Sequence, residues 1–120
     1  MTTQDKCCSL SPYFKVHAGK LAEFKKLTEA FNEKTKTEPD CLYYGFCFDG
    51  EIAHCREGYA DAAALLHHLG NVDDLLKQAL KMSDITRLEV HAPADELEKL
   101  RAPLAALKPQ MFTLEIGFRR

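Results

Sequence analysis

The stretch Cys41-Leu-Tyr-Tyr-Gly-Phe-Cys-Phe-Asp-Gly-Glu-Ile-Ala-His-Cys-Arg-Glu-Gly-Tyr59 decides the fold that we expect for this chain. It contains two runs rich in aromatic and other apolar residues, 41–48 and 51–59, on either side of Asp49-Gly50. Asp-Gly between two such runs is a strong signal for a two-residue turn. The stretch therefore predicts a β-hairpin.

The segment before the hairpin has the period of an amphipathic helix. In residues 18–36, apolar side chains recur every three or four positions, with charged residues between them: Leu21, Phe24, Leu27 and Phe31. Glu38-Pro39-Asp40 follows and would end the helix.

Two more helical segments follow the hairpin. Asp61 is placed to cap a helix that carries several leucines, Gly70 would break it, and Asn71 would cap a second piece. Residues 93–107 also have a helical pattern, opened by Pro93 and interrupted by Pro103.

Three further runs predict strands at residues 8–16, 84–92 and 110–118. The resulting order, β-α-β-β-α-β followed by an extra α-β, is the ferredoxin-like arrangement of an α+β protein. Its helices cover one face of an antiparallel sheet. We expect one domain over residues 1–120, with a core at about 8–92 and an extension at about 93–120.

The composition excludes several classes of partner. The 120 residues include 16 Lys and Arg and 18 Asp and Glu, for a net charge of −2, and neither sign forms long runs. A nucleic-acid or anionic-membrane partner would require a basic face. There is no apolar run of the ~20 residues that a membrane span needs. Residues 1–6 lack the apolar core of a signal peptide, so we expect a cytoplasmic protein.

The cysteines predict reduced thiols and no metal centre. There are five, without C-x-x-C spacing. Cys47, His54 and Cys55 are close in sequence, but neighbouring residues of a strand point to opposite faces, so His54 and Cys55 do not easily share a metal ion.

Strand alternation divides the predicted sheet into an apolar and a polar face. We assign to the helix-covered face the apolar series Phe14/Val16, Leu42/Tyr44/Phe46/Phe48, Ala53/Cys55/Tyr59, Leu88/Val90 and Phe112/Leu114/Ile116. The alternate positions gather polar groups: Tyr13/Lys15, Cys41/Tyr43/Cys47, His54/Arg56, Arg87/Glu89/His91 and Glu115. This set is either a solvated outer face or a partly enclosed polar pocket; a one-residue slip of register would exchange the two faces.

Under the pocket interpretation, the polar residues carry chemistry. Arg56 or Arg87 would stabilise an oxyanion, and His54 or His91 would move a proton. We expect the substrate to contact Tyr13, Tyr43, Glu89, Tyr59 and His68. Tandem histidines on a helix point in directions about 100° apart, so at most one of His67 and His68 faces a site.

Three segments resemble the antibiotic biosynthesis monooxygenase (ABM) family over about residues 8–92. Residues 16–24, Val-His-Ala-Gly-Lys-Leu-Ala-Glu-Phe, resemble its V-x-x-G-x-x-x-x-F opening. Residues 56–62 and the following His68-Leu69 resemble its strand-to-helix segment, and residues 41–46 are similar to its second strand. The resemblance implies a homodimer whose sheets pack face to face into an α+β barrel.

The resemblance also implies candidate activities. Some members are cofactor-independent oxygenases of polyketide-like phenols, and others degrade haem. His68 matches the iron-ligating histidine of the haem-degrading members, but those have an indole where this chain has Tyr59 and an Asn in the first strand, and this chain has no Trp.

The leading hypothesis is thus a cofactor-independent, monooxygenase-like enzyme without metal. It would act on a small anionic or phenolic molecule in a pocket between sheet and helices. In such enzymes the substrate's own anion reacts with O2, so the protein supplies deprotonation, shielding and orientation. The alternative is a non-catalytic module that binds a small molecule or forms a dimer; haem binding is a third.

Overall fold

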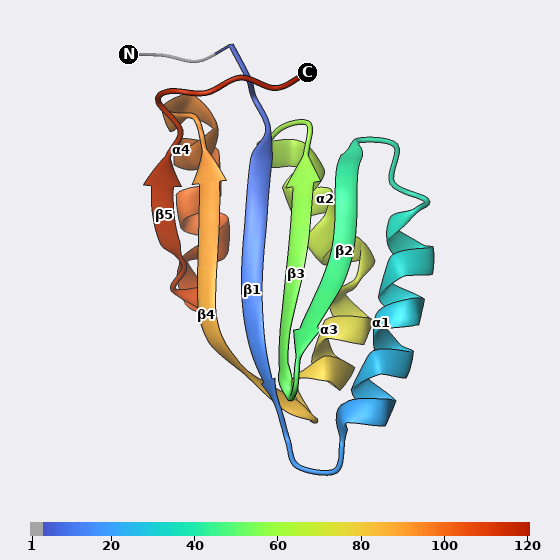
Figure 1. Ribbon diagram of the computed structural model, residues 1–120. Helices are drawn as coiled ribbons and strands as arrows, with labels where there is room; N and C mark the ends of the chain where they lie inside the picture. Colours follow the sequence, from blue (N-terminus) through green and yellow to red (C-terminus); the bar gives the residue numbers. More distant parts are fainter. Residues whose placement is uncertain (1–3) are drawn as a thin grey trace.

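The computed structural model describes residues 4–120 and shows an α+β chain with a five-stranded sheet (Figure 1). The strand order is β2-β3-β1-β4-β5. Along the chain the elements are β1 Cys8–Val16, α1 Leu21–Thr35, β2 Cys41–Asp49, β3 Ile52–Tyr59, α2 Ala62–Asn71, α3 Asp73–Ala79, β4 Ser83–Ala92, α4 Ala94–Leu104, the 3-10 turn η1 Ala105–Leu107, and β5 Gln110–Thr113. The ferredoxin-like order predicted from the sequence is therefore confirmed.

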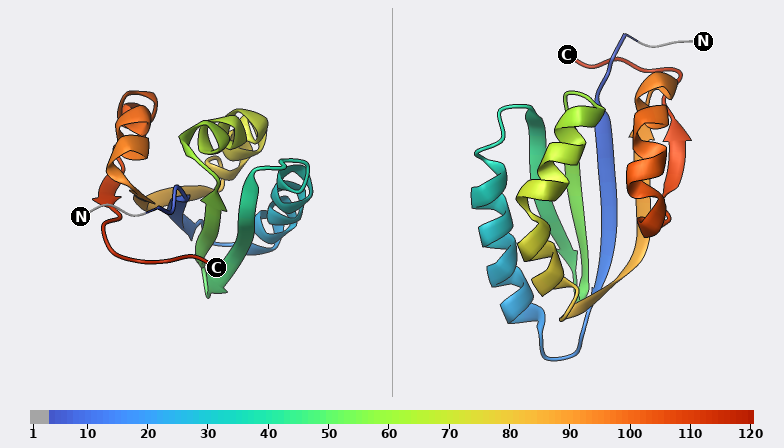
Figure 2. Two further views of the ribbon diagram at one scale, coloured as in Figure 1. Left: turned by 90° about the horizontal axis from the view of Figure 1, so that it is seen from above. Right: turned by 180° about the vertical axis from the view of Figure 1, so that it is seen from behind.

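In the part of the chain that the structure describes, all helices lie on one face of the sheet and none lies over the other face (Figure 2). We call these the covered face and the open face. The sheet of the single chain does not close into a barrel. Among the described residues, no helix is both long and apolar enough to cross a membrane. The first three residues of segment 1–6, which we analysed for a signal peptide, lie outside the described range.

The hairpin forms as predicted, but its turn is one residue later. Asp49 pairs with Ile52, so the two turn residues are Gly50 and Glu51. Gly50 has φ of +59°, a conformation that side chains with a Cβ rarely adopt. Glycine at the first central position is characteristic of type II′ hairpin turns.

A bulge at Leu42 reverses our face assignment at the start of β2. Cys41 pairs with Tyr59 and Tyr43 with Gly58, so Leu42 is an extra residue. Consequently Cys41 packs against buried residues of the covered face, whereas Leu42 is 40% exposed. We had predicted the opposite for both.

Next to this bulge, the ring of Tyr43 occupies the space over Gly58. A Cβ at Gly58 would lie 2.2 Å from Tyr43 Cε2, which is far inside van der Waals contact. Gly58 thus permits a close approach of this ring to the backbone of β3.

The first helix after the hairpin begins where we predicted, but the boundary between it and the next helix lies later in the sequence than we predicted. The Asp61 carboxylate accepts a hydrogen bond from Ala64 N at 2.9 Å and caps α2. The predicted break at Gly70 is wrong, because α2 continues to Asn71 and α3 begins after the buried Val72. Asn71 does not cap α3, since its side-chain amide donates to Glu38 and to the carbonyl of Lys34.

The C-terminal extension differs from the prediction in three ways. Phe112, which we assigned to the covered face, lies on the open face, where its ring contacts that of His91. β5 pairs with β4 in parallel, through the crossover helix α4, so the sheet is mixed. β5 also ends at Thr113 rather than near Phe118, and Ile116 and Phe118 are 77% and 81% exposed. The reason is that β4 ends at Ala92, whose carbonyl accepts the last bond, from Leu114 N, leaving no ladder partner beyond it.

Two buried clusters form the core of the covered face. An aliphatic cluster, including Leu65, Leu97 and Leu100, lies under α2 and α4. An aromatic cluster, including Phe14, Phe24 and Phe31, lies under α1 and α3. The candidate site lies between these clusters.

Candidate active site

A narrow pocket of about 50 Å³ lies between the sheet and the helices. Its lining is almost entirely aliphatic and aromatic, contributed by all of β1 to β4, by α1 to α3 and by η1. The ionisable side chains in this lining are Tyr44, Cys55, Glu57 and His68, and none of the lining residues from the described range 4–120 is Lys or Arg. An apolar pocket with a few convergent polar groups is the usual form of a small-molecule site.

Glu57 is a buried carboxyl group on the covered face. The alternation of β3 directs Ala53, Cys55, Glu57 and Tyr59 toward the helices, and all four are buried. Tyr59 Oη donates a hydrogen bond to Glu57 Oε1 at 2.5 Å. Burial raises the pKa of Glu57 to about 7, against the lowering effect of hydrogen bonds from Tyr59 and Cys55. The group therefore gains and loses its proton near neutral pH.

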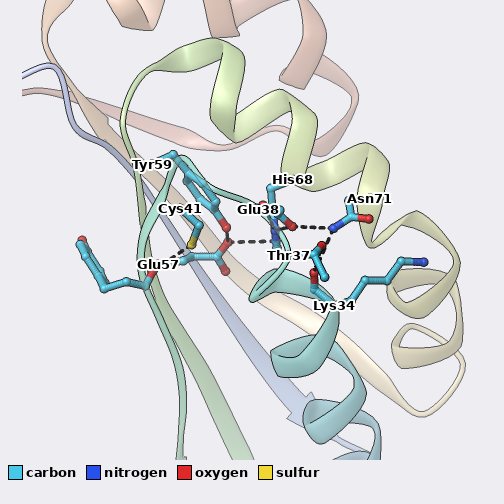
Figure 3. A network of polar contacts seen from close by, with 9 residues as sticks. Lys34, Thr37, Glu38, Cys41, Glu57, Tyr59, His68 and Asn71 are labelled. Carbon is cyan, nitrogen blue, oxygen red and sulfur yellow. Dashed lines mark hydrogen bonds and ion pairs between the residues drawn. The ribbon is translucent and has the colours of Figure 1, made fainter.

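His68 of α2 connects Glu57 to a second buried carboxylate, Glu38 (Figure 3). His68 Nδ1 lies 2.9 Å from Glu38 Oε2 and 3.1 Å from Oε1, and Nε2 lies 3.4 Å from Glu57 Oε1. Because a carboxylate accepts hydrogen bonds, the shorter contacts place the ring proton on Nδ1. The lone pair of Nε2 then faces Glu57.

Glu38 is itself held in place by Asn71. The Asn71 side-chain amide donates to Glu38 Oε2 at 2.8 Å and to the carbonyl of Lys34 at 3.3 Å. The loop after α1 is thereby tied to the last turn of α2. Burial lowers the pKa of His68, while the hydrogen bond with Glu38 opposes that shift.

Two aromatic rings fix the orientation of the imidazole. The ring centroids of Tyr59 and Tyr44 lie 5.0 and 5.3 Å from that of His68. Burial raises the pKa of Tyr59, and the neighbouring Glu57 carboxyl adds to the effect, so its hydroxyl keeps its proton and remains a donor. The side chains thus present a positioned acid–base group to the pocket.

Comparison with known proteins connects this geometry to a family. No family model matches the sequence, and a search of curated proteins found no match. Among solved structures, MupZ from Pseudomonas fluorescens is 50% identical, with 96% of this chain and 95% of that chain covered and a TM-score of 0.92. Identity of this degree over nearly the whole length decides the relationship.

The chain belongs to the family of MupZ. Its fold is that of the ABM-like proteins. A structure described as an antibiotic biosynthesis monooxygenase has a TM-score of 0.61 at 20% identity, covering 69% of this chain and 92% of that one. Rv0793 from Mycobacterium tuberculosis has a TM-score of 0.65 at 23% identity, covering 75% and 97%. These two show a shared fold.

In this member of the MupZ family, two of the nine predicted site residues, Tyr59 and His68, lie beside the pocket. His68 is buried, whereas its neighbour His67 is exposed, as expected for adjacent residues on a helix. The other seven lie on the open face, away from the pocket: Tyr13, Tyr43, His54, Arg56, Arg87, Glu89 and His91.

On the open face, these side chains form two groups. Toward β2, Tyr13 and His54 stack with ring centroids 4.3 Å apart, and the Arg56 guanidinium lies 5.2 Å from the ring centre of Tyr43. His54 Nδ1 is also 3.1 Å from the carbonyl oxygen of Pro12.

Toward β5, Glu89 contacts both Arg87 and His91, the latter at 3.0 Å. Arg87 also donates to Gln110 at 2.9 Å. The side chains of this group contact one another, but they lie on the open face and therefore apart from the pocket.

Sequence reasoning missed the two carboxyl groups of the site. Glu57 stands at the inward position between Cys55 and Tyr59, in a series that we assigned to the covered face. An acidic residue within an otherwise apolar series is the signal that would have found it. Glu38 lies in the loop after α1 and has no such periodicity, so nothing in the sequence indicated its burial.

Proposed function

We propose that this protein is a monooxygenase-like acid–base enzyme that acts on a small, neutral, largely apolar organic molecule in the pocket between the sheet and the helices. The observation that supports this is the Glu57 carboxyl group, which is hydrogen-bonded to Tyr59 and faces His68. Among the described residues that line the apolar pocket, it is the one acidic side chain. In its ionised form Glu57 accepts a proton from an acidic C–H or O–H group of the substrate. In its protonated form it returns one.

The lining favours a neutral substrate over an anionic one. An anion in this pocket would lie near the carboxyl groups of Glu57 and Glu38 and would meet no Lys or Arg in the lining. Such a charge would be both desolvated and unpaired. A phenol or an activated ketone enters neutral and becomes charged only when Glu57 removes its proton.

The monooxygenase reaction extends this proton transfer. After deprotonation, the substrate anion would react with O2; one oxygen atom becomes the product carbonyl, and the other leaves as water with the two hydrogens of the substrate CH2. O2 is the oxidant, so the reaction requires no metal or organic cofactor. The protein contributes the base, a dry pocket and orientation.

We also propose that the protein is a homodimer formed through the open face. Within residues 4–120, no helix lies over this face (Figure 2). It carries the exposed rings of Tyr43 and Phe112. The segment after β5 adds the strongly exposed Ile116 and Phe118. A sheet face without a helix over it can pack against a second sheet, with the side chains of the two faces interdigitating. Light scattering after gel filtration measures the mass: about twice 13.6 kDa is expected, and a monomer would contradict the dimer.

Hydrogen–deuterium exchange tests the acid–base function without knowledge of the natural substrate. The protein is incubated in D2O with 2-tetralone or with 2-octanone, and the loss of the proton signals next to the carbonyl is followed by NMR. We expect the wild type to accelerate exchange of at least one ketone and Glu57→Gln to abolish the acceleration. An oxygen electrode records O2 uptake in the same samples.

Each outcome assigns a different function. Exchange with O2 uptake supports the monooxygenase reaction; exchange without uptake supports acid–base chemistry but contradicts oxygenation of these ketones. Ligand-induced shifts without exchange would favour the non-catalytic binding module. The control is Glu98→Gln, which makes the same chemical change on the exposed side of α4.

A further inference from the structure

We propose that Glu57, His68 and Glu38 form a proton relay that carries the proton exchanged with the substrate between the apolar pocket and a surface groove beside Glu38. The inference rests on the proposed function, because it assigns the route by which Glu57 regains or loses its proton. It makes Glu38, which does not line the pocket, a positioning residue for the reaction.

The first argument is the isolation of Glu57. It is 4% exposed, and apart from His68 the described residues that hydrogen-bond to its carboxyl group are Tyr59 and Cys55. Burial raises the pKa values of this tyrosine and this cysteine, so both stay neutral and neither removes a proton at neutral pH. A substrate that fills the narrow pocket separates Glu57 from solvent on that side. His68 is then the remaining acid–base neighbour.

The second argument is that the imidazole bridges two carboxyl groups. Its Nε2 faces Glu57 at 3.4 Å and its Nδ1 faces Glu38 at 2.9 Å (Figure 3). When Glu57 has taken a proton from the substrate, it passes that proton to Nε2, and the proton on Nδ1 moves to Glu38. One N–H bond forms and one breaks, and the imidazole ends as the other tautomer with its charge unchanged.

The third argument is a route to solvent at the far end. A groove lies beside Glu38 and is lined by residues of the loop before β2, by residues of α2 and by the residue that caps α2, among them Asp40, His67 and the cap Asp61. Glu38 borders both this groove and His68. The three side chains therefore connect the interior of the covered face to a separate part of the surface.

The other titratable groups around the relay do not compete with it. Burial raises the pKa of four neighbouring groups, which therefore keep their protons at neutral pH: Cys41 and Tyr44 of β2 and Cys55 and Tyr59 of β3. His67 of α2 is exposed and affects His68 through its charge. At neutral pH these tyrosines and cysteines keep their protons, so none of them replaces His68 as the acid–base group between Glu57 and Glu38.

Chemical rescue of ketone exchange tests the relay. Glu38→Ala removes the outer carboxylate and should lower the exchange rate of 2-tetralone in D2O by roughly 10-fold, a fraction of what a full acid–base group contributes. Added acetate should restore the rate in proportion to its concentration, because it can occupy the vacated position at the groove. Glu33→Ala, on the exposed side of α1, is the matched control and should show neither effect. A Glu38→Ala rate equal to wild type, or one that acetate does not restore, overturns the relay.

A second measurement needs no substrate and separates the relay from the proposed function. Nitrogen-15 NMR of the wild type should show the His68 proton on Nδ1, and carbon-13 NMR of the isosteric Glu38→Gln variant should show Glu57 titrating at lower pH. A proton on Nε2 in the wild type, or an unchanged Glu57 titration, overturns the relay. Failure of the wild type to exchange either ketone would instead contradict the proposed function, and the relay is then judged by NMR alone.

Discussion

The two faces of the sheet contain the same kinds of side chain in opposite surroundings. On the covered face, Glu57 and His68 are buried, and burial raises the pKa of Glu57 to about 7. On the open face, the Glu89 carboxylate contacts Arg87 and His91 near solvent, and the hydrogen bond from Arg87 lowers its pKa. A glutamate beside a histidine is therefore an acid–base group on one face and a permanent anion on the other.

The largest expected effect distinguishes the two glutamates in the same assay. Glu57→Gln should reduce ketone exchange by about 100-fold or more, the usual contribution of a positioned acid–base group. Glu89→Gln should leave the rate close to that of wild type, because Glu89 lies on the opposite side of the sheet from the pocket. NMR-monitored exchange rates check both. A large loss in Glu89→Gln would move the site to the open face.

The second effect is a change in the free energy of unfolding with pH that results from the raised pKa of Glu57. Its pKa is 4.5 in the unfolded chain and about 7 in the folded protein, so the folded state binds more protons between these values. The free energy of unfolding should therefore fall as pH rises from 4.5 to 7 and then level off. The fall is about 3 kcal/mol, from the energy equivalent of a pKa shift.

Urea unfolding across that pH range measures the effect of Glu57. Glu57→Gln has no proton to lose and should remove this part of the pH dependence, becoming relatively more stable at pH 8. Glu89→Gln should retain it. If Glu57→Gln kept the same fall in stability between pH 4.5 and 7, another group would be responsible.

A smaller effect is expected for Tyr59→Phe. The substitution removes the donor to Glu57 Oε1, which is buried, and should cost about 1–2 kcal/mol of unfolding free energy. Since this hydrogen bond lowers the pKa of Glu57, the variant should also titrate at a higher pH. Carbon-13 NMR of Glu57 checks the direction; a shift to lower pH would contradict the assigned donor.

The smallest effects should come from the arginines of the open face, which our sequence analysis placed in the site. Arg56→Ala and Arg87→Ala remove side chains that are exposed in the single chain and lie on the opposite side of the sheet from the pocket, and their ion pairs and ring contacts contribute little to the stability of that chain. Both variants should fold normally and catalyse exchange at the wild-type rate. Loss of exchange in either, with the fold intact, would support the open-face site that the sequence first suggested.

The sequence correctly predicted those helices and strands that are determined by the local periodicity of their apolar residues. The hairpin, the first strand and α1 follow from alternation and from the spacing of Leu21, Phe24 and Phe31. The Leu42 bulge could not be predicted, because one extra residue is decided by the pairing with β3 and not by β2 itself. The end of β5 depended in the same way on where β4 stops.

The candidate site was predicted only in part, for a related reason. His68 and Tyr59 fall at inward positions of α2 and β3, and the sequence placed both near a site. We gave most weight to the polar series of the open face, since a concentration of Arg and His suggested chemistry. Burial, more than residue type, gives Glu57 its acid–base character, and burial arises from packing across the whole covered face.

Gly58 couples the two sides of the molecule at a single backbone position. It separates Glu57 from Tyr59 along β3, and the ring of Tyr43 fills the place where its side chain would be. Any larger residue there would displace that ring or distort the strand, and distortion would move a carboxyl group and its phenol donor out of alignment. The alignment of Glu57 and Tyr59 on the covered face therefore depends on the absence of a side chain at Gly58, whose missing side chain leaves room for a ring on the open face.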